Sequence, residues 1–224
     1  AGADLVVLAT PIGVMGDLAR QMQPHLAAGC LVTDVGSVKY PVVRAVSHAL
    51  GGRARFVGSH PMAGSEQSGI EQARADLFRG AVCIITPAEE SDPAAVQQTH
   101  DFWQRLGAVV RTLPPQVHDE VVARVSHLPH VAAAALVNVV ARQGPELLGF
   151  AGPGFRDTTR VASGPAEMWV EICRENQQEI RRALDDLIGE LERLRAALAN
   201  ADGSELRAML KRAKHFRDEL KFRN

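Results

Sequence analysis

The chain of 224 residues is long enough for one large domain or two small ones, each with its own hydrophobic core. Hydrophobic residues make up 46% and charged residues 23%, an ordinary globular composition, and the formal net charge is -1. Such a charge gives no reason to expect a nucleic acid or an anionic membrane as partner. No apolar run approaches the roughly 20 residues of a membrane helix, so we expect a soluble protein.

Three cysteines, Cys30, Cys83 and Cys173, lie far apart and lack CxxC spacing, so neither a disulfide framework nor a zinc site is expected. This favours a reducing, cytoplasmic location. The N-terminus carries no signal-peptide pattern. It opens almost directly on the buried-strand pattern of residues 4–9, and we therefore expect a preceding segment to be missing.

The first half alternates short apolar runs with helical patterns. Strands are expected over 5–9, 31–34, 55–57, 82–85 and 108–111, and helices over 14–26, 38–50 and 92–106. Ser91 is a plausible N-cap for the last of these helices. This alternation predicts a parallel α/β sheet with both faces covered.

The second half contains no convincing strand after Pro114 and Pro115. Helical patterns run over 117–141 with a bend near Pro129, then over 166–176, 177–198 and 205–220, with a Gly/Pro-rich break over 144–153. The sequence therefore predicts two domains, residues 1–113 and 114–224. The long apolar stripe of 177–198 predicts burial against a second copy.

Polar residues follow three of the expected strands. Thr10 ends the first, Gly36 and Ser37 follow the second, and His60 stands in what we expect to be a Gly-bounded loop after the third. Thr10 alone is more simply part of a strand-to-helix turn, and Ser37 is equally well an N-cap. Imidazole is the side chain best suited to proton transfer near neutral pH, so these strand ends together predict an active-site edge centred on His60.

The helical half offers two further clusters. His127 and His130, three residues apart, could share a helix face, but without a matching carboxylate this spacing is a weak metal signal and no metal site is expected. They are either satisfied helix histidines or contacts for an anionic substrate. Residues 152–160 read as a Gly-rich turn whose Arg156 and Arg160 either grip a carboxylate or carry solvated surface charge.

Taken together, these segments resemble the prephenate and arogenate (cyclohexadienyl) dehydrogenase family of tyrosine biosynthesis. The matching motifs stand in family order and cover essentially the whole chain. They are LATP at 8–11, TDVGSVK at 33–39, GSHPMAGSEQSG at 58–69, SHLPH at 126–130, GFRDTTR at 154–160 and MW at 168–169.

The resemblance implies an α/β Rossmann-type parallel sheet, followed by an all-α dimerisation domain that helps to build the active-site cleft. The chain departs from the family at its start, where the GxGxxG turn that holds the cofactor pyrophosphate is not found. The Rossmann-type domain is therefore expected to be N-terminally incomplete.

The implied reaction is the oxidative decarboxylation of prephenate to 4-hydroxyphenylpyruvate, with hydride transfer to NAD or NADP, NAD being favoured. By resemblance, His60 accepts a hydrogen bond from the ring hydroxyl and polarises it. Ser37 orients His60 and touches the nicotinamide end of the cofactor. Thr10, Pro11 and Gly36 are the other expected cofactor contacts.

The resemblance also implies the substrate contacts. Arg160 would grip a substrate carboxylate and His130 would contact the other end of the substrate. The other expected members are Ser126 and His127 in the same wall, Glu66 and Asp157 in a charged gate with Arg160, and Trp169 near the cleft. For Trp169 a place in the core fits equally well.

Three alternatives stay open. The first is an arogenate or dual-specificity enzyme, although His130 favours prephenate or dual use. The second is a related dehydrogenase acting on a 3-hydroxy acid. The third is a non-catalytic dimerising or aromatic-ligand-binding fragment. Tyrosine is a further candidate ligand, as a feedback inhibitor competing in the same cleft.

Overall fold

The computed structural model describes residues 2–63, 71, 73–200 and 202–220. The chain divides into two compact units, Ala1–Ile180 and Arg181–Asn224, and the predicted active-site residues belong to the first. Among the described helices, none combines the length and apolar character needed to cross a membrane.

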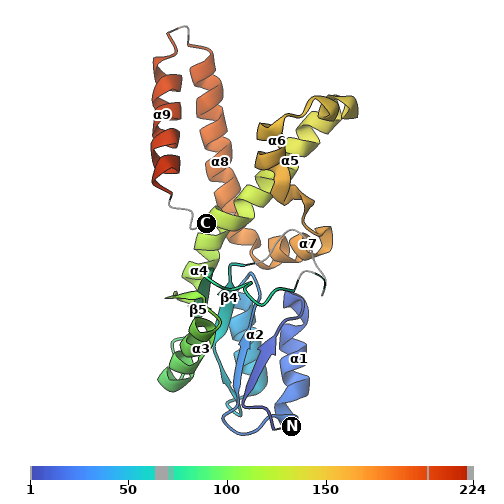
Figure 1. Cartoon of the computed structure of the whole chain (residues 1–224), viewed down its shortest axis with the longest axis vertical. Coiled ribbons are helices and arrows are strands. Elements are labelled where there is room, and N and C mark those ends of the chain that lie inside the picture. The colour runs from blue at the N-terminus through green and yellow to red at the C-terminus, as the bar shows by residue number, and fades with distance from the viewer. Residues whose placement is uncertain (1, 64–70, 72, 201, 221–224) are drawn as a thin grey trace. The chain divides into compact units, whose positions relative to one another are not determined.

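In the part of the first unit that the structure describes, six strands form two three-stranded sheets (Figure 1). The first sheet is parallel, in the order β1 (Leu5–Leu8), β2 (Leu31–Asp34), β3 (Arg55–Phe56). In the second sheet, β5 (Val82–Thr86) lies between β4 (Gly58–Pro61) and β6 (Val109–Thr112). The β5–β6 pair is parallel, as expected, whereas β4 runs antiparallel to β5.

Strand β4 corrects one prediction, because residues 58–64 were expected to form a loop. Residues 58–61 instead continue the chain after β3 as a fully buried strand, with His60 opposite Ile84 of β5. Gly58 permits this close pairing: a Cβ there would lie 2.5 Å from Thr86 Oγ1 and 2.9 Å from Val43 Cγ2. The Gly-bounded segment reads as a loop in sequence, but only glycine fits between the strand and α2 (Tyr40–Leu50).

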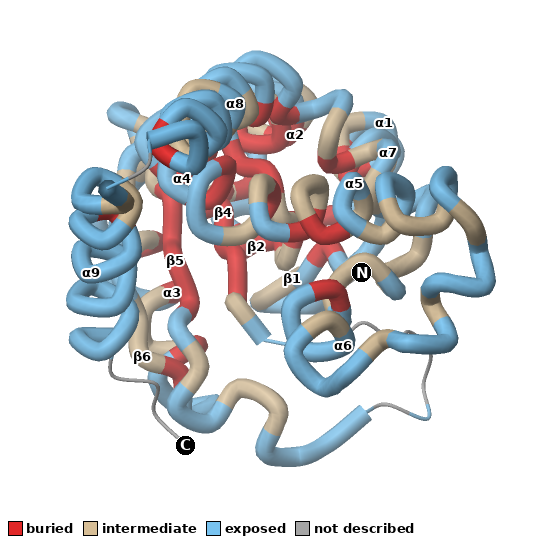
Figure 2. Tube along the Cα trace, turned by 90° about the horizontal axis from the view of Figure 1, so that it is seen from above, coloured by how far each residue is buried: buried red, intermediate tan, exposed pale blue. Residues whose placement is uncertain are grey.

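Helices cover both faces of the first sheet. Because successive strand residues point to opposite faces, Val32 packs into a core with α1 (Met15–Met22) and α2, while Leu31 packs into a second core with Trp103 of α3 (Pro93–Arg105). Two 3₁₀ turns, η1 (Ile12–Val14) and η2 (Gln23–His25), flank α1. Figure 2 shows β2, β4 and β5 as the buried centre of this arrangement.

The predicted cap of α3 is wrong by one residue. Asp92 is the N-cap, and its Oδ1 accepts a hydrogen bond from the Ala94 backbone N–H at 3.0 Å. Ser91 Oγ instead accepts from the Ala88 N–H at 2.9 Å, in the turn before the helix.

After residue 113 the described residues form helices and turns without strands, as predicted. In chain order these elements are α4 (Pro115–Val122), the π-helical turn η4 (Ala123–His127), α5 (Leu128–Gln143), η5 (Pro145–Phe150), α6 (Pro153–Thr159), η6 (Arg160–Ser163), α7 (Ala166–Glu175), α8 (Gln177–Leu198) and α9 (Ser204–Glu219).

The long helix is interrupted next to Pro129, as predicted: the π-helical turn η4 runs directly into α5, and Pro129 stands in the first turn of α5. Another detail of this half differs from expectation. Residues 152–160 were expected as a Gly-rich turn. They form α6 and the start of η6, because Pro153 occupies the first helical position and can start a helix.

The second unit consists of the rest of α8 together with α9. Several large apolar side chains of these helices are exposed: Ile188, Leu191, Leu198, Leu210 and Phe216. The apolar stripe predicted for 177–198 therefore includes side chains that the described chain does not cover.

Candidate active site

His60 lies on β4 with only 7% of its surface exposed. Its Nδ1 is 2.8 Å from Nε2 of His118 on α4, and the two rings meet edge to face at 5.1 Å between centroids. His118 Nδ1 is in turn 2.8 Å from Oδ1 of Asp119. Asp119, His118 and His60 thus form a continuous buried chain of hydrogen bonds between the helical segment and the sheet.

Asp119 is held at the N-terminus of α2. Its Oδ1 accepts from the Lys39 backbone N–H at 2.7 Å, and its Oδ2 accepts from the Tyr40 N–H at 2.8 Å. A carboxylate in this position is stabilised by the unpaired N–H groups and the positive end of the helix dipole. Its main-chain carbonyl accepts from Asn176 Nδ2 at 2.9 Å.

A buried ion pair supports the backbone next to His60. Lys39 Nζ pairs with Asp34 Oδ2, both side chains being fully buried, and also donates to the Ser59 carbonyl at 2.9 Å. Asp34 Oδ1 accepts from the Ser59 N–H at 2.9 Å. Burial lowers the pKa of Lys39, although the neighbouring Asp34 opposes this shift. Both main-chain groups of Ser59 are therefore fixed, which sets the position of His60.

Burial also keeps the two paired histidines neutral. The pKa of His60 lies well below its ordinary 6.5, mainly because burial penalises the charged ring and also because His118, Lys39 and His127 lie nearby. Burial likewise lowers the pKa of His118, against the opposing effect of Asp119. A neutral imidazole at His60 is the form that can accept a hydroxyl proton.

The π-helical turn and α5 form a second histidine group. The ring of His130 stacks on Trp169 of α7, with centroids 3.5 Å apart and an angle of 9° between planes. His127 meets the same indole edge to face at 6.0 Å. Ser126 is half-buried in the same turn. Trp169 also packs against the core of the sheet, and its predicted place near the cleft stays a prediction.

Two buried ring nitrogens of this group, His127 Nε2 and His130 Nδ1, have no hydrogen-bond partner within the part of the chain that the structure describes. Burial lowers the pKa of His127 to about 4. Burial also lowers that of His130, with a hydrogen bond to the Val161 backbone opposing it. Buried polar atoms are normally paired, so these two nitrogens are candidates for contact with a ligand.

The predicted charged gate is described only in part. Arg160 begins η6, next to Val161, and its side chain is exposed. Asp157 lies exposed on α6. Glu66 lies outside the described residues, so its predicted part in the gate stays a prediction.

The predicted cofactor residues come together in one wall. A cavity of about 960 Å³ is lined by Thr10, Pro11, Gly36 and Ser37 on one side and by α7 on the other. A Cβ at Gly36 would lie 3.0 Å from Asp34 Oδ2 and 3.3 Å from Ile12 Cγ1, so glycine keeps this wall thin. The residues fit the close approach of a flat ring to the strand ends.

Comparison with known proteins identifies the family to which the chain belongs. A family model described as "Prephenate dehydrogenase, nucleotide-binding domain" matches residues 1–112, and one described as "Prephenate dehydrogenase, dimerization domain" matches residues 114–212. The cyclohexadienyl dehydrogenase of Zymomonas mobilis is 34% identical, over 99% of this chain and 74% of that protein. The chain belongs to the prephenate dehydrogenase family.

Other members of the prephenate dehydrogenase family agree. The prephenate dehydrogenase of Bacillus subtilis is 36% identical over 99% of this chain, and the match covers 61% of the B. subtilis protein. The crystal structure of prephenate dehydrogenase from Aquifex aeolicus, in complex with hydroxyphenyl propionate and NAD+, superposes with a TM-score of 0.91 at 35% identity, covering 97% of this chain and 77% of that one. Synechocystis arogenate dehydrogenase gives 0.84 at 33% identity, covering 97% and 79%.

Membership in the prephenate dehydrogenase family confirms the predicted fold class, a Rossmann-type sheet followed by a helical domain, and the predicted class of NAD(P)-dependent oxidoreductase. The chain spans about three-fifths of the B. subtilis relative. The predicted domain boundary near residue 113 stays a prediction, because the compact units of the structure divide at a different place, after Ile180.

Four residues of this family member were missed in the sequence: His118, Asp119, Lys39 and Asn176. His118 holds the Nδ1 of the His60 ring, and Ser37 lines the cavity. The expected role of Ser37 in orienting His60 stays a prediction. The His118-Asp119 pair, which follows Pro115 after two residues, was an available signal. Nothing in its spacing, 58 residues from His60, indicated the contact.

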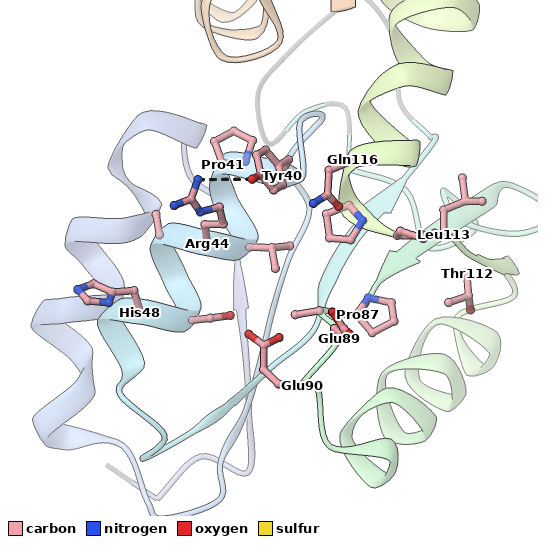
Figure 3. Close-up of a pocket in the computed structure, with 16 residues that line it drawn as sticks. Tyr40, Pro41, Arg44, His48, Pro87, Glu89, Glu90, Thr112, Leu113 and Gln116 are labelled. Atoms are coloured by element: carbon pink, nitrogen blue, oxygen red, sulfur yellow. Dashed lines mark hydrogen bonds between the residues drawn. The ribbon is translucent and has the colours of Figure 1, made fainter.

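A second cavity, of about 1410 Å³, lies beside α2 and is separate from this chemistry (Figure 3). Its lining includes Arg44, Glu89 and Glu90, but none of the predicted site residues of the dehydrogenase. Arg44 is occupied locally: it lies 3.5 Å from the Tyr40 hydroxyl and 5.5 Å from the centre of that ring.

Proposed function

We propose that the protein catalyses the oxidative decarboxylation of prephenate to 4-hydroxyphenylpyruvate, with His60 as the base for the ring hydroxyl. The observation that carries this proposal is the buried His60, held through Nδ1 by His118 and kept neutral because burial lowers its pKa. Nε2 is then the ring nitrogen that accepts from the substrate.

In this proposal, a residue of the chain accepts and returns the proton of the substrate hydroxyl. Bound NAD(P) supplies the hydride acceptor. His60 takes the proton of the hydroxyl while the carbinol carbon is oxidised. The ring carboxylate leaves as carbon dioxide, its bonding electrons aromatise the ring, and His60 returns the proton to the phenol oxygen. The low pKa of His60 favours that return.

The helical segment supplies the substrate contacts of this proposal. Arg160 binds one carboxylate of prephenate, since guanidinium pairs with carboxylates in a bidentate way. His130 and His127 bring buried ring nitrogens toward the other end, with Trp169 as an apolar surface against the substrate ring. Thr10, Pro11, Gly36 and Ser37 form the cofactor side.

Arogenate is the second candidate substrate. It differs from prephenate by an amine in place of the side-chain keto group, and a relative at 33% identity is named an arogenate dehydrogenase. His130, with its ring nitrogen buried in the substrate wall, supports a keto acid or dual use. The rival dehydrogenase of a 3-hydroxy acid does not account for the histidines of the helical wall.

Partners and location complete the proposal. The match to a dimerization domain and the exposed apolar residues of α8 and α9 support a homodimer. Tyrosine, which resembles the aromatic product, is proposed as a feedback inhibitor in the same cleft. The described cysteines are free, Cys30 and Cys83 being buried, which supports a cytoplasmic location.

The decisive experiment is a steady-state assay of the protein with prephenate and with arogenate, each with NAD and with NADP. We expect turnover of prephenate, with carbon dioxide and reduced cofactor formed in equal amounts. Turnover of arogenate alone would transfer the proposal to the second candidate. Binding of an aromatic acid without any turnover would support the non-catalytic alternative.

A further inference from the structure

His60 and His127 are the two ends of one chain of hydrogen bonds. From His60 the chain runs through His118 to the carboxylate of Asp119, and from the carbonyl of the same residue it runs through Asn176 to His127. His118, Asp119 and Asn176 were not among the predicted site residues. Each link imposes a donor or an acceptor on the next.

The first half of the chain fixes the proton on His60. Both carboxylate oxygens of Asp119 already accept from backbone N–H groups, at 2.7 and 2.8 Å, so this group faces His118 as an acceptor. His118 must then donate from Nδ1, and in its neutral form its Nε2 is bare. His60 must therefore donate from Nδ1, which leaves its own Nε2 as an acceptor.

The second half fixes the proton on His127. The carbonyl oxygen of Asp119 can only accept, so the amide nitrogen of Asn176 must face it, at 2.9 Å. The same nitrogen lies 3.2 Å from His127 Nδ1, which therefore accepts. In a neutral ring the proton then sits on Nε2, the buried nitrogen without a partner among the described residues.

We propose that this chain holds the two histidines in opposite tautomers, so that His60 presents a bare Nε2 to the substrate hydroxyl and His127 presents a protonated Nε2 to a substrate oxygen, a carboxylate or a carbonyl. His118, Asp119 and Asn176 are positioning residues. The inference rests on the proposed function for its two substrate contacts, but the tautomers themselves do not depend on it.

The surroundings keep both end histidines neutral, as opposite tautomers require. Among the described residues, the charged or titratable groups near them include Lys39, Asp34, Asp119, His118, His130 and Cys83. Lys39 is paired with Asp34, and Asp119 is held by the backbone of α2. Burial is the largest cause of the low pKa of both His60 and His127.

The direct test is nitrogen-15 NMR of the histidine rings in the full chain at about pH 7.5, where neutral imidazoles show which nitrogen carries the proton. The eight histidines are assigned with His60→Asn and His127→Gln. We expect the proton on Nδ1 of His60 and on Nε2 of His127. Both rings in the same tautomer would overturn the proposal, whatever the protein turns over.

A matched pair of variants tests the positioning role. His118→Gln retains an amide oxygen near the position of Nε2 that can accept from His60, whereas His118→Leu has no acceptor. We expect kcat to fall about 10- to 10²-fold in His118→Leu with little change in KM, a mixed tautomer at His60, and recovery of both in His118→Gln. Equal effects of the two variants on the His60 tautomer would overturn the proposal.

Failure of the inference and failure of the proposed function are distinguishable. The expected tautomers in a protein that turns over neither prephenate nor arogenate would contradict the function alone. Turnover of prephenate by a protein with Nε2-protonated His60 would contradict the inference alone.

Discussion

For single residues, burial has two consequences at this site. Burial keeps His60 uncharged and able to accept a proton, and the same burial requires every polar neighbour to be paired. The pairing is provided by Asp119 and the Lys39–Asp34 ion pair, whose charges are satisfied by backbone groups and by each other. Substitutions at this scale should therefore affect the rate more than the fold when they conserve shape.

His60→Asn tests the proposed base. The amide retains polarity but cannot take a proton near neutral pH, so kcat for prephenate should fall by about 10² to 10⁴. In the parent protein the low pKa of His60 predicts that activity is retained well below pH 6.5 and declines only as His60 becomes protonated. Steady-state rates across pH measure both effects, and unchanged turnover in the variant would refute the assignment.

Arg160→Ala tests the carboxylate contact. Removal of the guanidinium should raise KM for prephenate about 10-fold or more, with little effect on the affinity for the cofactor, which is proposed to bind at the strand ends. Arg156→Ala, an exposed arginine one turn earlier on α6, is the matched control and should leave KM nearly unchanged. Equal effects of the two substitutions would indicate general surface charge instead of a specific contact.

At the scale of elements, β4 and the N-terminus of α2 position the site. β4 holds His60 between the sheet and α4, and α2 holds Asp119 at its first turn. Both depend on close approach of backbone, at Gly58 for the strand and at Lys39 and Tyr40 for the helix. A displacement of either element would therefore change the distance between His60 and His118.

Gly58→Ala tests this dependence. The added Cβ would lie 2.5 Å from Thr86 Oγ1 and 2.9 Å from Val43 Cγ2, so the strand or the helix must move. We expect a loss of about 1 to 3 kcal/mol in the free energy of unfolding, measured in urea, together with reduced kcat. Gly149→Ala has no neighbouring atom within 4 Å and serves as control. Similar stability of the two variants would contradict the steric argument.

At the scale of the whole molecule, buried neutral histidines couple stability to pH. His60, His118 and His127 have a lower pKa in the fold than in the unfolded chain. The unfolded state therefore binds more protons below pH 6.5, and stability is lost as pH falls from there toward the pKa of the folded state.

His127 alone should account for a loss of about 2 kcal/mol between about pH 7.5 and about pH 5, because its pKa falls from 6.5 to about 4 on folding. Urea unfolding at the two pH values measures the loss. In His127→Gln the loss should be smaller by about that amount, since glutamine does not titrate. A protein equally stable at both pH values would show that these rings are not buried and neutral.

The sequence alone was enough to predict the fold class, because alternating short apolar runs and helical periods report burial directly, residue by residue. It also determined which strand ends and which helical turn carry polar chemistry, including His60, His127 and His130. These features depend on residues that are close together in the chain, so they can be predicted from the sequence.

The contacts that those residues make with one another depend on how the whole chain folds. His60 and His118 are 58 residues apart, and Asp119 meets the first turn of α2 across about 80 residues. Such contacts arise from strand register and helix packing, which no local pattern encodes. That long-range packing is the reason for the proposed tautomers and for the low pKa values. It is also the reason that residues 58–61 form β4, where a loop was expected.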